Sequence, residues 1–254
     1  MNVIILAAGF GTRLYPLTRF KPKALLELNG KTLLDHLMEK VENLRPVREI
    51  VIVSNKRFYN DFSLWRGQCA LRKRIRMVDN GVHDPEKRGG AIRDLYLGIE
   101  SCRTASDGFL VLCADNYFDF PLGYFLLPCF GHQKFAFIGI YDLKDKSQAM
   151  RFGVLEVAED GKVISFEEKP ANPKSSIVSL GVYYFPARFC FRLYEYLYIE
   201  GSNPDRIGDF IAWLAHKEPL YGVMFDGHWF DIGSIESYEK AKGILENDSA
   251  YQCE

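Results

Sequence analysis

The hydrophobic positions in the first half of the chain alternate between short apolar runs and segments with helical spacing. Residues 3–8 (VIILAA) form a continuous apolar run ending in glycine, which is typical of a strand buried on both faces of a parallel sheet. Apolar side chains then recur at helical spacing from Leu33 to Leu44, and Thr32 is placed to cap that helix. Further strands are predicted at residues 49–54, 75–78 and 109–113, and a second helix at residues 90–101. This alternation predicts an α/β fold with three layers, in which helices cover both faces of a sheet.

The second half of the chain contains more strand-like segments. Its pattern predicts strands at residues 135–141, 153–157, 163–168, 178–185 and 220–225, and helices at residues 188–198, at residues 205–216 and from Ser234 onward. Asp160-Gly161 predicts a hairpin turn in which both residues take positive φ angles. No linker, repeat or low-complexity tract interrupts the chain. We therefore expect residues 1–254 to form a single domain whose later strands extend the sheet and wall a cleft.

Charge and composition exclude several classes of protein. The 254 residues include 32 basic and 33 acidic side chains, a net charge of −1, so no overall field attracts nucleic acid or an anionic membrane. No apolar run approaches the ~20 residues that cross a bilayer, and the N-terminus lacks the basic region of a signal peptide. The 6 cysteines form no Cys-x-x-Cys pair and do not cluster with histidines, which favours reduced thiols. We therefore expect a cytoplasmic protein that binds neither nucleic acid nor membranes.

Residues 6–18 (LAAGFGTRLYPLT) carry the strongest candidate chemistry in the chain. Gly9 and Gly11 follow the first predicted strand, where backbone N–H groups can close around a polyphosphate without interference from a Cβ. Arg13 adds a guanidinium fork for phosphate oxygens, and Lys23 adds a mobile point charge. A bare Gly-x-Gly is also compatible with a simple tight turn. A dinucleotide fingerprint is excluded because Leu14 stands where the third glycine belongs, and no Gly-Lys-Ser/Thr follows to make a Walker loop.

The loop, followed by residues 21–28 (KPKALLEL), resembles the motif of the sugar-1-phosphate nucleotidyltransferases, the family of glucose-1-phosphate thymidylyltransferase and its uridylyl, cytidylyl, adenylyl and guanylyl relatives. The resemblance extends over nearly the whole chain. It implies a Rossmann-like nucleotidyltransferase fold with a mixed, mostly parallel sheet. In this fold, residues 1–133 bind the nucleotide and residues 134–254 bind the sugar phosphate. Arg13 and Lys23 would contact the triphosphate, together with nucleotide contacts at Leu6, Ala8, Gly9, Gly11 and Thr12.

Two carboxylates are candidate metal ligands. Asp115 comes just after the buried strand at residues 109–113, and Asp231 precedes the last predicted helix. Each has an ordinary alternative as a turn residue or a helix cap. The segments around them, Ala114-Asp115-Asn116 and residues 229–233 (WFDIG), resemble the two metal-ligand motifs of the family. The resemblance therefore implies that Asp115 and Asp231 bind Mg²⁺, which keeps several waters and takes only one or two protein carboxylates.

The second half of the chain is expected to bind the sugar phosphate, the substrate that would accept the nucleotide. Lys169 can neutralise an attacking sugar phosphate and Glu168 can accept hydrogen bonds from sugar hydroxyls, although a solvated ion pair is the ordinary alternative. Glu168-Lys169-Pro170 resembles the acceptor-phosphate motif of the family. Gly153 and Gly181 resemble its sugar-contacting glycines, but either could equally spare a clash within a strand.

The segment expected to contact the base departs from the thymidylyltransferase pattern. Gly89 and Gly90 resemble the base-contacting turn of the family. The glutamine of that pattern is missing upstream, where residues 78–81 read VDNG and are followed by a charged insertion at residues 84–88. The identity of the base and of the sugar therefore stays open.

The resemblance implies transfer of a nucleoside monophosphate from a nucleoside triphosphate to a sugar-1-phosphate, giving a nucleoside-diphosphate sugar and pyrophosphate. The attacking phosphate is already ionised at neutral pH, so catalysis rests on positioning and charge neutralisation by Arg13, Lys23, Lys169 and Mg²⁺. Two alternatives remain. One is a cytidylyltransferase that acts on a non-sugar phosphate such as phosphocholine or an inositol phosphate, and the other is a non-catalytic subunit that senses nucleotide sugars. The oligomeric state is also open, with a homo-oligomer among the options.

Overall fold

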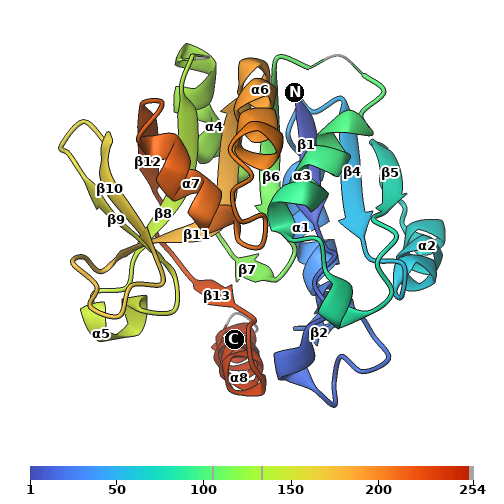
Figure 1. Cartoon of the computed structure of the whole chain (residues 1–254). Coiled ribbons are helices and arrows are strands. Elements are labelled where there is room, and N and C mark those ends of the chain that lie inside the picture. The colour runs from blue at the N-terminus through green and yellow to red at the C-terminus, as the bar shows by residue number, and fades with distance from the viewer. Residues whose placement is uncertain (105, 133, 252–254) are drawn as a thin grey trace.

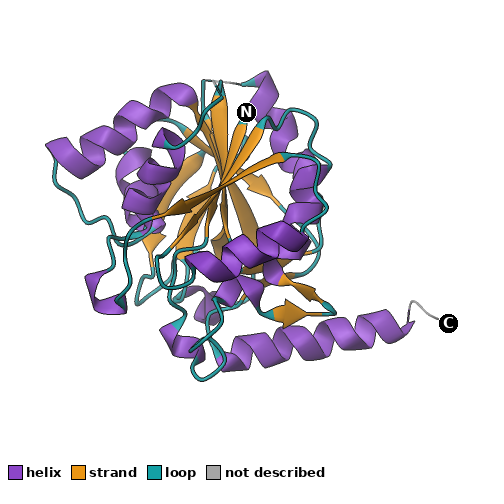
Figure 2. Ribbon diagram, turned by 90° about the vertical axis from the view of Figure 1, so that its right-hand side faces the viewer, coloured by secondary structure: helices purple, strands orange, loops and turns teal. Residues whose placement is uncertain are grey.

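The computed structural model describes residues 1–104, 106–132 and 134–251. Its centre is a mixed sheet, covered by helices on both faces (Figures 1 and 2). The predicted three-layer α/β fold is therefore confirmed.

The first half of the chain builds a parallel core in this sheet. Its strands are β1 (Asn2–Leu6), β4 (Glu49–Ser54), β5 (Arg74–Asp79) and β6 (Gly108–Cys113). β1 pairs in parallel with β4 on one side and with β6 on the other, and β5 extends the sheet beyond β4. Leu6 lies opposite both Val53 and Cys113, so the carboxyl ends of the three central strands meet at one edge. That edge is where parallel α/β sheets bind ligands.

The second half continues the same sheet. Its strands are β8 (Ala136–Asp142), β9 (Gly153–Val157), β10 (Val163–Glu168), β11 (Ile177–Pro186) and β12 (Leu220–Met224). β11 runs antiparallel to β6 and so joins the two halves, giving the order β10-β9-β11-β6-β1-β4-β5, while β8 pairs with β11 and β12. The sheet is therefore a parallel core with a mixed extension.

Helices pack on both faces of the sheet, and the last helix lies outside these two layers. The helices are α1 (Leu33–Glu42), α2 (Tyr59–Gln68), α3 (Ala91–Glu100), α4 (Leu122–Gly131), α5 (Lys146–Ala149), α6 (Cys190–Tyr194), α7 (Ile207–Ala215) and α8 (Ile235–Tyr251). Val3 and Ile5 pack with α1, α2 and α4 on one face, whereas Ile4 packs with α3, α6 and α7 on the other. This alternation explains the continuous apolar run of β1, because both of its faces are buried. None of the helices in the described part of the chain has the length and apolar character that crossing a bilayer requires.

The predicted cap of α1 is confirmed. The Thr32 hydroxyl accepts a hydrogen bond from the Asp35 backbone N–H at 3.0 Å, and the Asp35 carboxylate accepts one from the Thr32 N–H at 3.1 Å. This reciprocal pair satisfies two backbone donors that the first turn of a helix leaves without intrahelical partners.

Several elements differ from the sequence prediction. In the hairpin between β9 and β10 only Gly161 has a positive φ, 83°. The Asp160 carboxylate accepts the Lys162 N–H at 3.0 Å, a local turn contact that needs no positive φ at Asp160. The helix predicted at residues 188–198 is divided into a 3₁₀ turn, η4 (Ala187–Phe189), then α6, then the π-helical η5 (Glu195–Ile199). Three helices were not predicted at all, namely α2, α4 and α5. Four short strands were also missed: β2 (Glu27–Leu28), β3 (Lys31–Thr32), β7 (Asn116–Phe118) and β13 (Trp229–Asp231).

Among the cysteines, the five that the structure describes carry free thiols, as expected, and Cys253 lies outside the described residues.

Candidate active site

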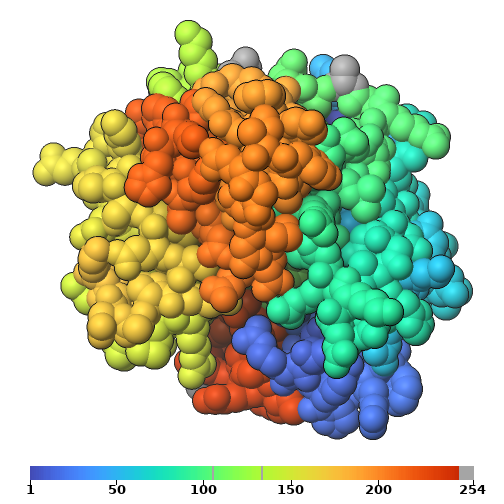
Figure 3. All heavy atoms as spheres, viewed as in Figure 1, coloured from blue at the N-terminus to red at the C-terminus, as the bar shows by residue number. Residues whose placement is uncertain are grey.

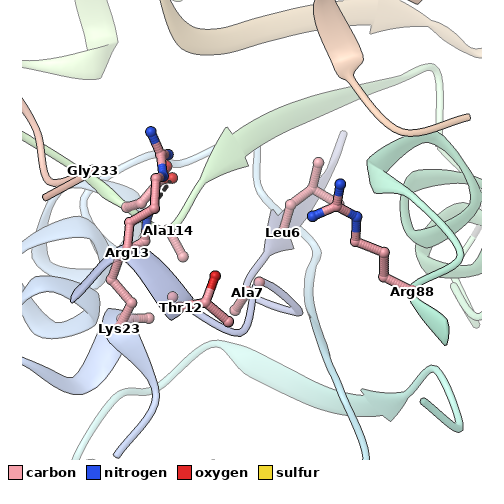
Figure 4. Close-up of a pocket in the computed structure, with 12 residues that line it drawn as sticks. Leu6, Ala7, Thr12, Arg13, Lys23, Arg88, Ala114 and Gly233 are labelled. Atoms are coloured by element: carbon pink, nitrogen blue, oxygen red, sulfur yellow. Dashed lines mark hydrogen bonds and ion pairs between the residues drawn. The ribbon is translucent and has the colours of Figure 1, made fainter. Parts of the chain in front are cut away.

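A cavity of about 250 Å³ opens at the carboxyl ends of β1 and β6 (Figure 4). Figure 3 shows the face that is hollowed between the blue N-terminal segment and the orange segment of the second half. The cavity is lined by Leu6, Ala7, Gly9, Gly11, Thr12, Arg13, Lys23, Ala24, Arg88, Ala114, Asp115 and Gly233. Of the residues predicted to hold the nucleotide or the metal, Leu6, Gly9, Gly11, Thr12, Arg13, Lys23 and Asp115 thus share one cavity.

The glycine loop owes its shape to Gly11. This residue has a φ of 64° and starts the 3₁₀ turn η1 (Thr12–Leu14). The buried Thr18 hydroxyl donates a hydrogen bond to the Gly11 carbonyl at 2.7 Å, and a Cβ at Gly11 would lie 3.1 Å from Thr18 Cγ2. Both the backbone conformation and the close contact therefore require glycine here, and the bend leads into η1, whose Thr12 and Arg13 line the cavity.

The two predicted carboxylates lie side by side although they are more than a hundred residues apart in the chain. β7 and β13 form an antiparallel ribbon in which Asp231 lies opposite Asn116. The Ile232 N–H donates to the Asp115 carbonyl at 2.9 Å, which fastens the end of this ribbon. The Asn116 side chain donates to Asp115 Oδ1 at 2.9 Å and accepts a hydrogen bond from Trp229 Nε1 at 2.8 Å. Asp115 is therefore oriented by two linked hydrogen bonds, the first of which comes from Trp229 on the neighbouring strand.

Two cations compensate these carboxylates. Lys23 Nζ lies 2.7 Å from Asp115 Oδ2. A Cβ at Gly233 would lie 3.0 Å from Asp231 Oδ2 and 3.6 Å from Arg13 Nη2, so this glycine leaves room for the guanidinium to approach the carboxylate. Figure 4 shows Arg13 and Lys23 on the same side of the cavity.

The two carboxyl groups titrate differently. Burial disfavours ionisation of Asp115, but the charge and hydrogen bond of Lys23 outweigh it and hold the pKa of Asp115 below its usual range. Burial and then the charge of Asp115 raise the pKa of Asp231 to about 6. Such crowding of carboxylates, only partly compensated by the protein, is the situation that a bound cation relieves. In the described residues no group of three or more histidine, cysteine or acidic side chains could hold a metal, so two carboxylates are what this site offers. This ligand set fits Mg²⁺.

A second cluster of charges lies at the end of β10. Lys169 Nζ is 3.7 Å from Glu168 Oε1, and the Lys169 N–H donates to the Phe152 carbonyl at 2.9 Å. Lys169 has a φ of 51°, a left-handed conformation that is uncommon for residues other than glycine and is concentrated at functional sites. The positive charge of Lys169 also favours the ionised form of Asp231 and so opposes the rise of its pKa. The predicted acceptor residues and the predicted metal ligands are therefore within electrostatic reach of each other.

Glu168 is packed against the start of α7. A Cβ at Gly208 would lie only 1.9 Å from Glu168 Oε2, so the carboxylate occupies the space that this glycine leaves open. Burial raises the pKa of Glu168. The positive charges of Lys169 and Arg206 oppose this rise, and the negative charge of Asp209 adds to it. Glu168 is thus a largely buried carboxylate among charges of both signs.

Of the remaining predicted glycines, Gly90, Gly153 and Gly181 have structural explanations and Gly89 has none, and their contacts with ligands stay predictions. Gly181, with a φ of 77°, lies in β11 where a Cβ would be 2.9 Å from Asn116 Nδ2. A Cβ at Gly153 would lie 2.4 Å from Phe166 Cζ, and one at Gly90 would lie 2.3 Å from the Pro204 carbonyl oxygen. Gly89 is the residue before Gly90, and its Cβ would meet only the Arg93 side chain, at 3.6 Å.

The predicted contact at Ala8 also stays a prediction. Its carbonyl accepts a hydrogen bond from Asn55 Nδ2 at 2.9 Å. This bond ties the glycine loop to the end of β4.

Sequence reasoning missed three residues of the site. Asn116 orients Asp115, Gly208 makes room for Glu168, and Arg88 lines the cavity. Asn116 could have been found, because it belongs to the same tripeptide as Asp115. Arg88 stands in the charged insertion that marks the departure from the thymidylyltransferase pattern, and that departure was a signal in the sequence that could have pointed to it.

The fold and the site define an α/β protein that presents a glycine loop, two cations and a pair of carboxylates at the carboxyl edge of its sheet. The chain belongs to the nucleotidyl transferase family, whose model matches residues 2–248. The family predicted from the N-terminal loop is therefore confirmed.

Individual relatives agree with this assignment. The chain is 29% identical to the bifunctional protein GlmU of Methanocaldococcus jannaschii over 92% of its own length, but it spans only 51% of that protein. It is 27% identical to the UTP–glucose-1-phosphate uridylyltransferase AglF of Haloferax volcanii, over 100% of both chains. A Bacillus anthracis protein assigned as a glucose-1-phosphate thymidylyltransferase, solved with sucrose, has a similar structure, with a TM-score of 0.79 and 26% identity over 96% of this chain and 94% of that one. The chain thus spans about half the length of the bifunctional relatives it matches.

Proposed function

We propose that this protein transfers a nucleoside monophosphate from a nucleoside triphosphate to a sugar-1-phosphate and releases pyrophosphate, with Mg²⁺ as the metal. The observation that carries the proposal is the position of Asp231. It lies beside Asp115, which lines the triphosphate cavity, and the charge of Lys169 on the acceptor side acts on it. In this proposal one pair of carboxylates serves both substrates. The two parts of the chain, residues 1–133 and 134–254, act as a single catalytic unit in this proposal.

The reaction is an in-line displacement. An oxygen of the sugar phosphate forms a bond to the α-phosphorus while the bond from that phosphorus to the bridging oxygen breaks, and pyrophosphate leaves with the electron pair. Asp115 and Asp231 would hold Mg²⁺, which when bound would supply positive charge to offset the charge developing on the phosphates. Arg13 and Lys23 hold the triphosphate, Lys169 holds the attacking phosphate, and Glu168 accepts hydrogen bonds from sugar hydroxyls.

The sugar acceptor is favoured over phosphocholine by Glu168. A quaternary ammonium has no hydrogen to donate and is usually held by aromatic faces. Glu168 instead offers acceptor oxygens next to the Lys169 ammonium, an arrangement that suits a hydroxylated phosphate. A non-catalytic sensor is disfavoured because the chain retains Arg13, Lys23 and both carboxylates.

The test is a pyrophosphate-release screen. Purified protein with Mg²⁺ is incubated with each of dTTP, UTP, CTP, GTP and ATP against a panel of sugar-1-phosphates, phosphocholine and inositol phosphate. We expect release with at least one sugar-1-phosphate and none in excess chelator. Release with phosphocholine or inositol phosphate alone would establish the non-sugar alternative. Nucleotide-sugar binding without turnover of any pair would establish the sensor.

The Gly208 contact gives a steric prediction. Gly208→Ala would place a methyl group where Glu168 Oε2 now lies, and the carboxylate must move. We expect the KM for the sugar phosphate to rise about tenfold, because a small misplacement of a positioning group is costly, while the affinity for the nucleotide stays the same. Steady-state kinetics with each substrate varied in turn measure both effects.

A matched glycine serves as the control for this variant. Gly67 lies in α2, where a Cβ would meet nothing within 4 Å. Gly67→Ala should leave both KM values unchanged and add up to about 1 kcal/mol of stability, the usual gain for this exchange in a helix. An unchanged sugar-phosphate KM in Gly208→Ala would show that Glu168 does not serve the acceptor.

A further inference from the structure

Arg88 is the third cation of the cavity, and it lies on the wall away from the other two. Figure 4 shows Arg13 and Lys23 on one side of the cavity, and Arg88 reaching from the other side toward Leu6. Leu6 and Ala7, its neighbours in the lining, offer apolar side chains. The carboxylates Asp115 and Asp231 belong to the side of Arg13 and Lys23. The charge of Arg88 is therefore separated from the groups assigned to the phosphates and the metal.

The orientation of Arg88 is set by Asp205. Nε of Arg88 lies 3.1 Å from Asp205 Oδ1, and Nη2 donates to Oδ2 at 3.2 Å. This bidentate pair uses one edge of the guanidinium. A guanidinium has five N–H groups in a fixed plane, so the N–H groups of Nη1 and the second one of Nη2 are left to face outward from the pair.

Asp205 itself is held by the backbone. Its carbonyl accepts the Ala91 N–H at 3.1 Å, and the carbonyl of the preceding residue, Pro204, accepts the Ile92 N–H at 3.0 Å. The close approach of Gly90 to Pro204 is what allows this docking. The loop before α7 thus caps the first turn of α3 and presents its carboxylate to Arg88. The Arg88 side chain keeps 66% of its surface exposed, so the ion pair restricts the guanidinium without burying it, and part of the side-chain freedom is lost before a ligand binds.

A second polar side chain near this end of the sheet is committed to the fold. Asn80 follows β5, and its Nδ2 donates to Asp94 Oδ1 at 2.8 Å while its Oδ1 accepts the Val82 N–H at 2.9 Å. Its amide is therefore occupied by structural contacts. Arg88, by contrast, lines the cavity itself and carries donors beyond those used by Asp205.

We propose that Arg88 recognises the nucleobase of the bound nucleoside triphosphate through a carbonyl oxygen and selects against adenine. The proposal rests on the proposed function, since it names the class of nucleotide for the same cavity. With the phosphates on the side of Arg13 and Lys23, the base end of the nucleotide lies over Leu6, within reach of Arg88. A guanidinium only donates hydrogen bonds, so a carbonyl oxygen is its best partner on a base, whereas adenine offers it only ring nitrogens beside a donating amino group. Guanine, cytosine, uracil and thymine each carry a carbonyl oxygen, and adenine carries none.

The test measures binding without turnover. Calorimetric titrations of the wild-type protein with GTP, CTP, UTP, dTTP and ATP should show that the best of the first four binds at least about tenfold more tightly than ATP, in line with the discrimination of a good bidentate contact. Arg88→Ala should lose about tenfold in affinity for that nucleotide and less than threefold for ATP. Inorganic tripolyphosphate, which has no base, should bind Arg88→Ala and wild type equally, whereas Arg13→Ala should weaken it. Preferential binding of ATP by the wild type, or an equal loss of tripolyphosphate affinity in Arg88→Ala, would overturn the proposal.

Asp205→Asn separates recognition from structure. This variant weakens the ion pair but keeps the guanidinium, so we expect a loss of a few fold with the preference against ATP retained. If Asp205→Asn and Arg88→Ala lose the preference to the same extent, Arg88 acts only through the ion pair and the proposal fails. The titrations measure nucleotide binding without a sugar phosphate. A base preference that depends on Arg88 would therefore support the proposal even if the pyrophosphate screen found no turnover. In that outcome the proposed reaction fails and the base contact does not.

Discussion

Asp115→Asn is expected to lower turnover by about a thousandfold, which corresponds to roughly 4 kcal/mol of transition-state stabilisation. The amide retains the size of the carboxylate but loses the charge that pairs with Lys23 and that would bind Mg²⁺. Steady-state rates of pyrophosphate release with saturating substrates measure the loss. Excess chelator should reduce the wild-type rate to a similar level.

The fold of this variant should survive. Burial, and then repulsion by Asp115, raises the pKa of Asp231 to about 6. Removal of the Asp115 charge lowers the pKa of Asp231 and leaves one full carboxylate to compensate Lys23 and Arg13. Thermal unfolding of Asp115→Asn should therefore lie close to that of the wild type.

Asp119→Asn is the matched control. Asp119 lies four residues from Asp115 but pairs with His228, at 2.9 Å, and does not line the cavity. We expect near wild-type turnover from it. A wild-type rate in Asp115→Asn, or full activity in chelator, would contradict the assignment of Asp115 as a metal ligand.

Much of the fold could be predicted because the strands have strong local patterns. The run at residues 3–8 is apolar throughout since both faces of β1 are covered, and α1 has both a capping box and a continuous apolar stripe. α2 lacked such a signal because only Phe62 and Trp65 are buried among its residues. α4 was hidden by Pro128 within it, a residue that normally argues against a helix interior.

The residues of the site also differ in whether a local sequence pattern marks them. Arg13, Lys23 and Asp115 could be found because each stands next to a strand end or a glycine loop that marks it in the sequence. Gly208 and Arg88 have their roles through contacts with Glu168 and Asp205, which are 40 and 117 residues away. Such contacts depend on which loops the sheet brings together, and a single sequence contains no local pattern for them.

Lys169→Ala is expected to raise the KM for the sugar phosphate and to lower turnover by about a hundredfold, while nucleotide binding without acceptor stays near wild type. The ammonium offsets repulsion between two anionic phosphates, an effect of about 1 kcal/mol in water and several in a drier cleft. It also aims the attacking oxygen, for which a small misplacement costs about a hundredfold in rate. The substitution keeps a Cβ at the left-handed φ of 51°, so the backbone strain at this position is little changed and the effect can be attributed to the charge.

Two measurements separate the acceptor role of Lys169 from a role on the triphosphate. Calorimetric nucleotide titration of Lys169→Ala without sugar phosphate should match the wild type, since Lys169 lies at the end of β10 and outside the lining of the triphosphate cavity. Lys174→Ala is the control: it removes an exposed lysine that pairs with Glu167 on the same side of the molecule, and both KM values should be unaffected. A large loss of nucleotide affinity in Lys169→Ala would move this lysine to the triphosphate. In that case the field of Lys169 on Asp231 would reflect a single shared phosphate site, and the division of the cleft into a nucleotide side and an acceptor side would be wrong.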